Sequence, residues 1–225
     1  MTTNTLDTAP VQQTLNALHE DARSDWKAML RHTPRVLWGL ARGKGVMQAF
    51  TPEMASGAYL PVSRDAGRLL NTVARATGAT HIVEFGTSFG LGTIYLAAAA
   101  KDNGGHVITT EIEPNKVRAA RANIERAALS PYATVREGDA LQTLTDVEAG
   151  IDLVFLDGWK DLYNDVLDLL LPRLAPGAVV VGDNIELAEA KDYYRRVSAP
   201  DSGFVTARMG REACLSCYLG PDAPS

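Results

Sequence analysis

Short apolar segments alternate with longer amphipathic segments from residue 81 onward, and this alternation restricts the fold more than any other feature. Helix-like runs separate the first five apolar segments, which predicts βαβ units and a parallel sheet. Uninterrupted apolar strands such as "LVFL" and "AVVV" indicate a sheet that helices cover on both faces. The last two segments are joined by "GRE" and predict an antiparallel hairpin at or near an edge of the sheet. The expected strands are 81–85, 106–111, 133–137, 151–157, 177–183, 203–209 and 213–219.

We therefore expect an α/β protein with a doubly wound, mostly parallel seven-stranded sheet and an N-terminal helical extension. No repeat or linker interrupts the sequence after about residue 60, so one domain is expected over residues 1–225. Within it, residues 1–56 form the helical extension or lid and residues 57–225 form the core. The stretch "MTTNTLDTAPVQQ" is interpreted as a disordered lead-in, and helical patterning follows it to about residue 50.

The composition excludes several classes of partner. A net charge of -5 argues against non-specific nucleic-acid binding, which needs a basic surface. No apolar run approaches the roughly 20 residues that span a bilayer, and the N-terminus lacks the basic and apolar regions of a secretion signal. Cys214 and Cys217 stand three apart on an expected strand, so they face opposite ways and make a poor disulfide or metal-binding pair. These features predict a cytoplasmic protein that binds neither membrane nor nucleic acid.

Glycines and acidic residues follow the first three expected strands, at the edge where α/β sheets bind ligands. The loop "EFGTSFGLG" allows close approach of a ligand to the backbone, although it is a weak signal alone. Glu111 could accept both hydroxyls of a ribose, or it could stabilise a helix N-terminus. Asp139 could bind an adenine amino group, or it could cap the helix that begins near Ala140. Together these residues favour a nucleoside ligand. Because no pyrophosphate-binding feature accompanies them, S-adenosylmethionine (SAM) fits better than a dinucleotide.

Two carboxylates and an amide follow the next two strands. Asp157 ends the strand 151–157, and Asp183 and Asn184 end the following one. Adjacent parallel strands lie about 4.8 Å apart, so these three side chains can converge. Such an all-oxygen set suits Mg²⁺. The alternative is that Asp183 and Asn184 form an Asx turn and Asp157 caps a helix. The coincidence of three oxygen donors favours the metal site.

The segments "VEFGTSFG", "EGDA", "DLVFLDGWKDLY" and "VVVGDN" resemble the metal-dependent, SAM-dependent O-methyltransferases of the catechol and caffeoyl-CoA group. The resemblance covers roughly residues 58–221, with "DLVFLDGWKDLY" its most specific block. It implies a Rossmann-like methyltransferase fold. It also implies methyl transfer from SAM to a hydroxyl of a catechol-like small molecule, with Mg²⁺ or another divalent cation.

The resemblance also assigns roles to individual residues. Asp157, Asp183 and Asn184 become the metal ligands, Lys160 the general base, and Trp159 a wall of the substrate pocket. The residues implied to bind the cofactor are Val62, Glu84, Gly86, Ser88, Gly92, Glu111, Ile112, Asp139, Ala140 and Asp157.

This chain departs from that group at three places. Gly158 stands where the catechol enzymes have a histidine, and Val205 where they have a late glutamate that contacts the second substrate hydroxyl. The segment 20–56, which shapes the acceptor pocket in the group, is unlike the animal enzyme. A different or bulkier vicinal phenol is therefore an open alternative to catechol. An NAD-dependent oxidoreductase and a non-catalytic SAM-binding relative remain competing hypotheses, and a homodimer is an alternative to a monomer.

Overall fold

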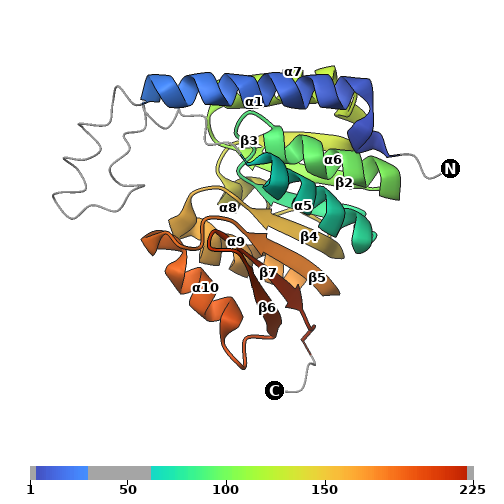
Figure 1. The fold of residues 1–225 in the computed structure, drawn as a ribbon. Coiled ribbons are helices and arrows are strands. Elements are labelled where there is room, and N and C mark those ends of the chain that lie inside the picture. The colour runs from blue at the N-terminus through green and yellow to red at the C-terminus, as the bar shows by residue number, and fades with distance from the viewer. Residues whose placement is uncertain (1–3, 30–61, 222–225) are drawn as a thin grey trace.

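The computed structural model describes residues 4–29 and 62–221 (Figure 1). The strands are β1 (His81–Phe85), β2 (His106–Glu111), β3 (Ala133–Glu137), β4 (Ile151–Leu156), β5 (Leu174–Gly182), β6 (Phe204–Met209) and β7 (Ala213–Tyr218). The α-helices are α1 (Ala9–Met29), α5 (Arg64–Ala76), α6 (Leu91–Asn103), α7 (Pro114–Arg126), α8 (Ala140–Thr143), α9 (Tyr163–Leu170) and α10 (Lys191–Ser198). The short 3-10 helices are η1 (Thr5–Asp7), η3 (Ser130–Tyr132), η4 (Lys160–Leu162), η5 (Leu171–Arg173) and η6 (Ala188–Ala190).

The seven strands form one sheet in the order β3-β2-β1-β4-β5-β7-β6, which confirms the expected doubly wound topology. β1 to β5 run parallel, and β7 lies antiparallel between β5 and β6, as the "GRE" connection predicts. β4 ends at Leu156 and β5 at Gly182, each one residue earlier than expected. Asp157 and Asp183 therefore stand just beyond their strands, at the edge of the sheet where the loops begin.

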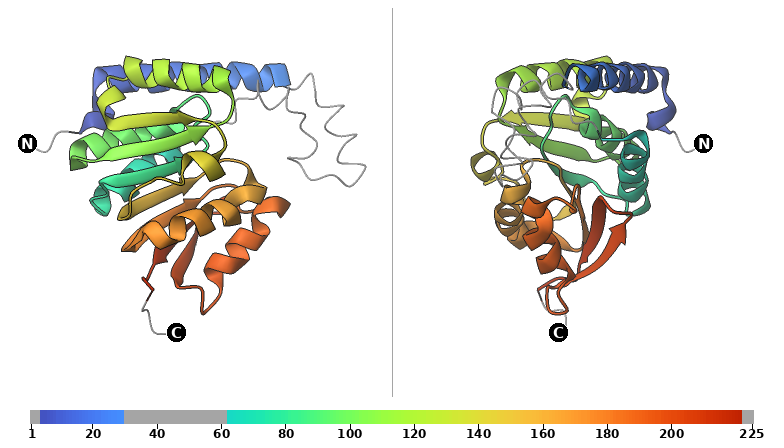
Figure 2. Two further views of the ribbon diagram at one scale, coloured as in Figure 1. Left: turned by 180° about the vertical axis from the view of Figure 1, so that it is seen from behind. Right: turned by 60° about the vertical axis from the view of Figure 1, so that its left-hand side comes forward.

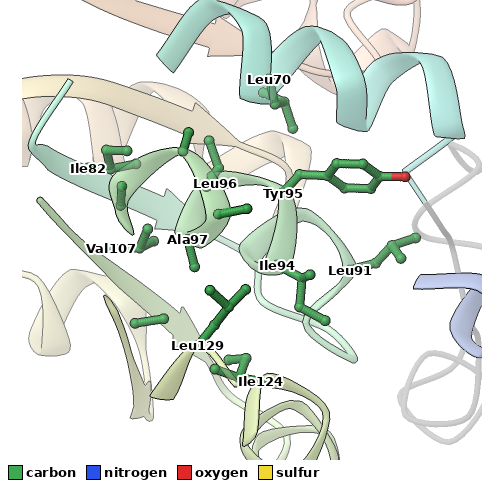
Figure 3. Close-up of a cluster of buried hydrophobic side chains, with 14 of the residues drawn as sticks. Leu70, Ile82, Leu91, Ile94, Tyr95, Leu96, Ala97, Val107, Ile124 and Leu129 are labelled. Atoms are coloured by element: carbon green, nitrogen blue, oxygen red, sulfur yellow. The ribbon is translucent and has the colours of Figure 1, made fainter. Parts of the chain in front are cut away.

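Helices cover both faces of the sheet and enclose two separate cores (Figure 2). α1, α5, α6 and α7 contribute to one core, and α8, α9 and α10 to the other. α6 is the most enclosed helix, with every residue from 91 to 100 buried (Figure 3). Its run of four alanines lets it lie close to the sheet and to α5 because small side chains need little space. The glycine loop that precedes α6 is consequently anchored to a rigid element.

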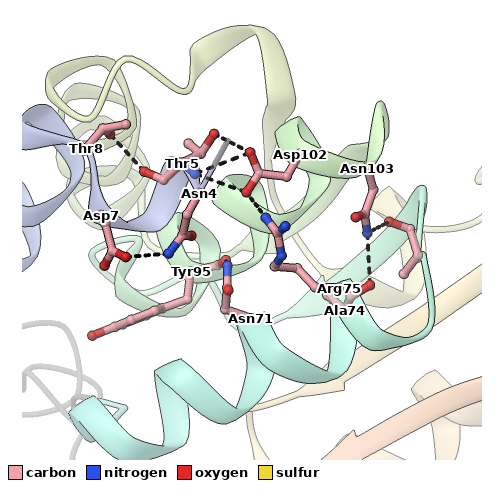
Figure 4. Close-up of polar contacts among 11 residues, drawn as sticks. Asn4, Thr5, Asp7, Thr8, Asn71, Ala74, Arg75, Tyr95, Asp102 and Asn103 are labelled. Carbon is pink, nitrogen blue, oxygen red and sulfur yellow. Dashed lines mark hydrogen bonds and ion pairs between the residues drawn. The ribbon is translucent and has the colours of Figure 1, made fainter. Parts of the chain in front are cut away.

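The N-terminal segment is ordered from residue 4, so the expectation of a disordered lead-in through residue 13 is wrong. Thr5 donates from its backbone N–H and its hydroxyl to the buried Asp102 carboxylate at the end of α6 (Figure 4). Buried residues of α1, among them Leu15, then pack in the same core as α6. The rest of the predicted extension, up to residue 56, lies mostly outside the described residues. Within the described ranges, every helix is too short or too polar to cross a membrane.

Candidate functional site

The candidate site is built on the carboxyl ends of β1, β4 and β5. In the last rungs of the ladder, Phe85 pairs with Leu156 and Leu156 pairs with Gly182. One residue further, Asp157 N donates to Phe85 O at 2.9 Å and Asp183 N donates to Leu156 O at 3.1 Å. The two aspartates therefore occupy equivalent positions on neighbouring strands. Their convergence, predicted from the sequence, follows from this register.

The chain turns sharply immediately after Asp183. Asn184 adopts the left-handed conformation, with φ of 53°. Asparagine tolerates this region better than most residues, which accounts for its presence at this turn. A strained backbone at the end of a strand is common at ligand-binding positions. The turn begins the connection to η6 and α10, and Leu187 N donates to Asn184 O at 3.1 Å.

Lys160 is an unusually buried lysine, with 5% of its side chain exposed. Its ammonium group lies 3.0 Å from Asp157 Oδ1, and 17% of the Asp157 side chain is exposed. η4, which starts at Lys160, follows the half-buried Trp159 and carries the lysine back toward the strand end. Asp157 and Lys160 are thus brought together as the resemblance implied.

Burial raises the pKa of both carboxyl groups at this edge of the sheet. Burial, followed by the charge of Asp157, raises the pKa of Asp183 to about 7. Burial also raises the pKa of Asp157, although the Lys160 ammonium opposes the shift. A nearby cation would favour the charged form of both carboxyl groups. The electrostatics of the pair therefore fit an additional positive ion.

The donor set at this edge is compatible with a hard divalent cation. Carboxylate and amide oxygens are the ligands that Mg²⁺ and Ca²⁺ prefer. In the part of the chain that the structure describes, no three His, Cys, Asp or Glu side chains form a metal-binding group. Asn184 follows Asp183 directly in the chain and carries the amide oxygen that the sequence predicted as the third protein ligand.

The glycine loop and Glu111 form the second half of the site. Ser88 has a positive φ of 49°, and in this conformation its N–H donates to Glu111 Oε2 at 2.8 Å. Glu113 N donates to Glu111 Oε1 at 3.0 Å. Each carboxylate oxygen retains a further lone pair, so the oriented carboxylate fits the two hydroxyls of a ribose. Ile112 beside it is 54% exposed and offers an apolar surface for a base.

Two residues of the loop region have clear packing roles. A Cβ atom at Gly86, where φ is 102°, would lie 2.6 Å from Gly158 N, so the loop passes directly over the chain after Asp157. A Cβ atom at Gly92 would lie 2.6 Å from Glu84 Oε1. Gly86 therefore requires glycine because backbone atoms fill the space, whereas a side chain at Gly92 would have to displace the Glu84 carboxyl group.

Glu84 lies beneath the glycine loop rather than at its surface. Its carboxyl group is fully buried and accepts a hydrogen bond from the Thr93 hydroxyl. Burial raises its pKa to about 8, against the opposing effect of hydrogen bonds from Thr93 and Thr109. The Thr87 and Thr109 hydroxyls share a 2.6 Å hydrogen bond close by. These buried threonines were not predicted as site residues. Their hydroxyl groups within otherwise apolar segments of the sequence could have indicated a buried polar partner such as Glu84.

The remaining predicted residues occupy varied environments. Asp139 Oδ1 accepts from Leu141 N at 2.9 Å, so this side chain caps α8, one of the two alternatives considered. Val62 and Ala140 are buried. Val205 is exposed on β6, which β7 separates from β5, so the expected counterpart of a late glutamate is two strands away from Asp183.

The space for a side chain at position 158 is taken by another residue. A Cβ atom built on Gly158 would lie 2.5 Å from the Phe85 ring. Phe85 belongs to the core beneath the strand ends and meets Tyr163 edge to face. The histidine of the catechol enzymes therefore has no room here, which explains the glycine at this position.

Comparisons with known proteins find methyltransferases among the proteins similar to this chain. A family model described as "Methyltransferase domain" matches residues 83–185. A catechol O-methyltransferase of Niastella koreensis is 35% identical over 130 residues, covering 56% of this chain and 58% of the relative. A protein of Mycobacterium bovis named "Putative O-methyltransferase" is 34% identical over 155 residues, covering 64% of this chain and 67% of the relative. This chain thus matches little more than half the length of the catechol enzyme.

A solved structure shows the same arrangement of elements. The O-methyltransferase from Bacillus cereus in complex with SAH superposes with a TM-score of 0.64 at 26% identity. The match covers 70% of this chain and 82% of that chain. The two proteins therefore share a fold, and the matched structure contains SAH, the demethylated form of SAM.

Proposed function

From the premise that this chain belongs to the class I SAM-dependent O-methyltransferase family, we propose that it transfers the methyl group of SAM to a hydroxyl of a vicinal diphenol. Asp157, Asp183 and Asn184 hold a divalent cation, and Lys160 accepts the proton of the reacting hydroxyl. The observation that carries the proposal is the buried ion pair between Lys160 and Asp157. Beside it lies a second carboxyl group, that of Asp183, whose pKa is raised to about 7.

The cofactor half of the site orients its ligand through Glu111 and the glycine loop. Glu111, itself held by the N–H groups of Ser88 and Glu113, accepts hydrogen bonds from the ribose hydroxyls. Ile112 covers one face of the adenine. When bound, SAM supplies an electrophilic methyl group on a sulfonium. The protein's task is to hold that group facing the acceptor pocket, where proximity and alignment lower the barrier.

The acceptor half of the site has to produce a phenolate. A phenol has a pKa near 10 and is mostly protonated at neutral pH. A divalent cation, when bound, stabilises the phenolate and fixes its orientation. The Lys160 amine lies 3.0 Å from Asp157 Oδ1 at this edge of the site. That amine takes the hydroxyl proton on Nζ. The phenolate oxygen then attacks the methyl carbon, the carbon–sulfur bond breaks, and the thioether leaves.

The class of acceptor rests on the name of a relative and on the donor set. A catechol O-methyltransferase is among the similar proteins, and a vicinal diphenol would offer a bound cation two further oxygen ligands. Trp159, half-buried beside Lys160, provides an aromatic wall for the ring. The exposed position of Val205, two strands away from Asp183, favours an acceptor that is held differently from catechol in the animal enzyme.

A substitution of Lys160 tests the proposed chemistry. Lys160→Ala should lower kcat by about 10²–10⁴-fold, the usual effect of removing a positioned base, while SAH affinity stays unchanged. The loss should be smaller with a nitrocatechol, because its more acidic hydroxyl needs less help to ionise. Lys160→Arg should not restore activity, since guanidinium does not accept a proton near neutral pH. An equal loss with acidic and ordinary catechols would show that Lys160 positions the substrate and is not the base.

A further inference from the structure

Tyr163 lies directly beneath the candidate metal site and is fully buried. Its hydroxyl donates toward two carbonyl oxygens on neighbouring strands, Leu156 O at 2.7 Å and Asp183 O at 3.1 Å. Leu156 immediately precedes Asp157, and Asp183 is itself an expected metal ligand. One phenol therefore joins the backbone of both carboxylate-bearing segments at the point where the β4–β5 ladder ends.

The backbone around Asp183 needs such a restraint. The last rung between the two strands is the hydrogen bond from Asp183 N to Leu156 O at 3.1 Å. The next residue, Asn184, is already in the left-handed conformation, so the chain leaves the sheet there. The Tyr163 hydroxyl is the second link between the same two residues. At the end of the ladder these two links together hold the Asp183 backbone against Leu156.

The ring of Tyr163 also contacts the lysine. Lys160 Nζ lies 5.2 Å from the ring centroid, within the range of a cation–π contact. The same ring packs edge to face with Phe85 and Tyr193, with centroids 6.3 Å and 5.4 Å apart. Burial, and then the nearby carboxylates, raises the pKa of Tyr163 well above its ordinary value, so the phenol remains a hydrogen-bond donor. Tyr163 thus contacts Lys160 and the backbone of Leu156 and Asp183 from within the core.

We propose that Tyr163 is a positioning residue that fixes Asp183 and Asn184 relative to Asp157 and so preorganises the site for a divalent cation. This inference rests on the proposed function, because it assumes that those three residues bind the ion. Hydrogen bonds that orient metal ligands commonly change metal affinity by about 10–100-fold when they are lost. The hydroxyl, rather than the ring, carries this effect, since the ring's packing is retained in phenylalanine.

The test compares Tyr163→Phe with a matched control, Tyr193→Phe. Tyr193 is equally buried and touches Tyr163, but its hydroxyl interacts with Cys214 and Ser216 and not with the carbonyl oxygens of Leu156 and Asp183. Mn²⁺ is titrated into each protein saturated with SAH, and free Mn²⁺ is followed by electron paramagnetic resonance. SAH affinity, melting temperature, and kcat and KM for SAM are measured in parallel.

Tyr163→Phe should weaken Mn²⁺ binding by about 10–100-fold and lower kcat at limiting metal, with SAH affinity and KM for SAM unchanged. Tyr193→Phe should bind Mn²⁺ as the parent protein does. Parental Mn²⁺ affinity in Tyr163→Phe would overturn the inference while leaving the metal site intact. A joint loss of SAH and Mn²⁺ binding, with melting far below that of Tyr193→Phe, would also overturn it, because the role would then be structural. If the parent protein bound no Mn²⁺, the proposed function would fail and the inference with it.

Discussion

At the scale of single residues, Glu84 is the clearest case of a group whose protonation depends on folding. Its carboxyl group is fully buried, and burial raises its pKa to about 8 from an ordinary 4.5. Between these values the folded protein keeps the proton that the unfolded chain releases. The stabilising contribution is therefore complete below pH 4.5 and is lost as the pH rises through about 8. Retaining an acid beneath the loop thus makes the protein less stable in alkaline solution.

Glu84→Gln should remove most of this pH dependence. Glutamine is close in shape and neutral at every pH. Between pH 5 and pH 9 the unfolding free energy should therefore fall by about 2–5 kcal/mol more in the parent protein than in Glu84→Gln. Chemical denaturation at several pH values measures the difference. Glu137→Gln is the matched control, because this glutamate also lies in a strand of the sheet but is exposed. Parallel curves for the parent and Glu84→Gln would show that Glu84 is ionised in the folded protein.

At the scale of elements, the N-terminal segment depends on one carboxylate for its attachment. Asp102 accepts two hydrogen bonds from Thr5 and pairs with Arg75, and only 3% of its side chain is exposed. Asp102→Ala should cost about 1–3 kcal/mol of unfolding free energy, because buried donors lose their acceptor. Limited proteolysis should also cut more readily before α1. Asp146→Ala, which removes an exposed ion pair with Arg136, should change neither property. Equal effects of the two substitutions would contradict the anchoring role of Asp102.

Elements that depend on neighbouring residues could be predicted from the sequence, and those that depend on distant contacts could not. The alternation of apolar and amphipathic segments is a local pattern, and it predicted all seven strands, three with the observed bounds and four with end errors of one to three residues. The largest error concerns β5, which begins at Leu174 rather than at residue 177. The order of the N-terminal lead-in could not be predicted in this way. The N-terminal segment is held by a contact between Thr5 and Asp102, which are 97 residues apart in the sequence. A pattern of neighbouring residues cannot predict such a contact.

At the scale of the whole molecule, topology explains which parts of the site could be predicted. Parallel strands end at the same edge of the sheet, so residues that follow β4 and β5 had to meet there. Asp157 and Asp183 could therefore be paired from the sequence. The Phe85 ring that excludes a side chain at Gly158, and the Tyr163 phenol that links two strands, could not. Both depend on how side chains from different elements share space, and that is determined only when the core is packed.

The most direct measurement of the central claim is methyl transfer to a catechol before and after removal of divalent cations. Activity should fall to background after exhaustive chelation and return when Mg²⁺ is added to the desalted protein. Asp183→Ala should stay inactive with Mg²⁺ while still binding SAH, because Glu111 and the glycine loop lie on other strands. Full turnover by the chelated, SAM-bound protein would contradict the proposal that Asp157, Asp183 and Asn184 act by holding a divalent cation.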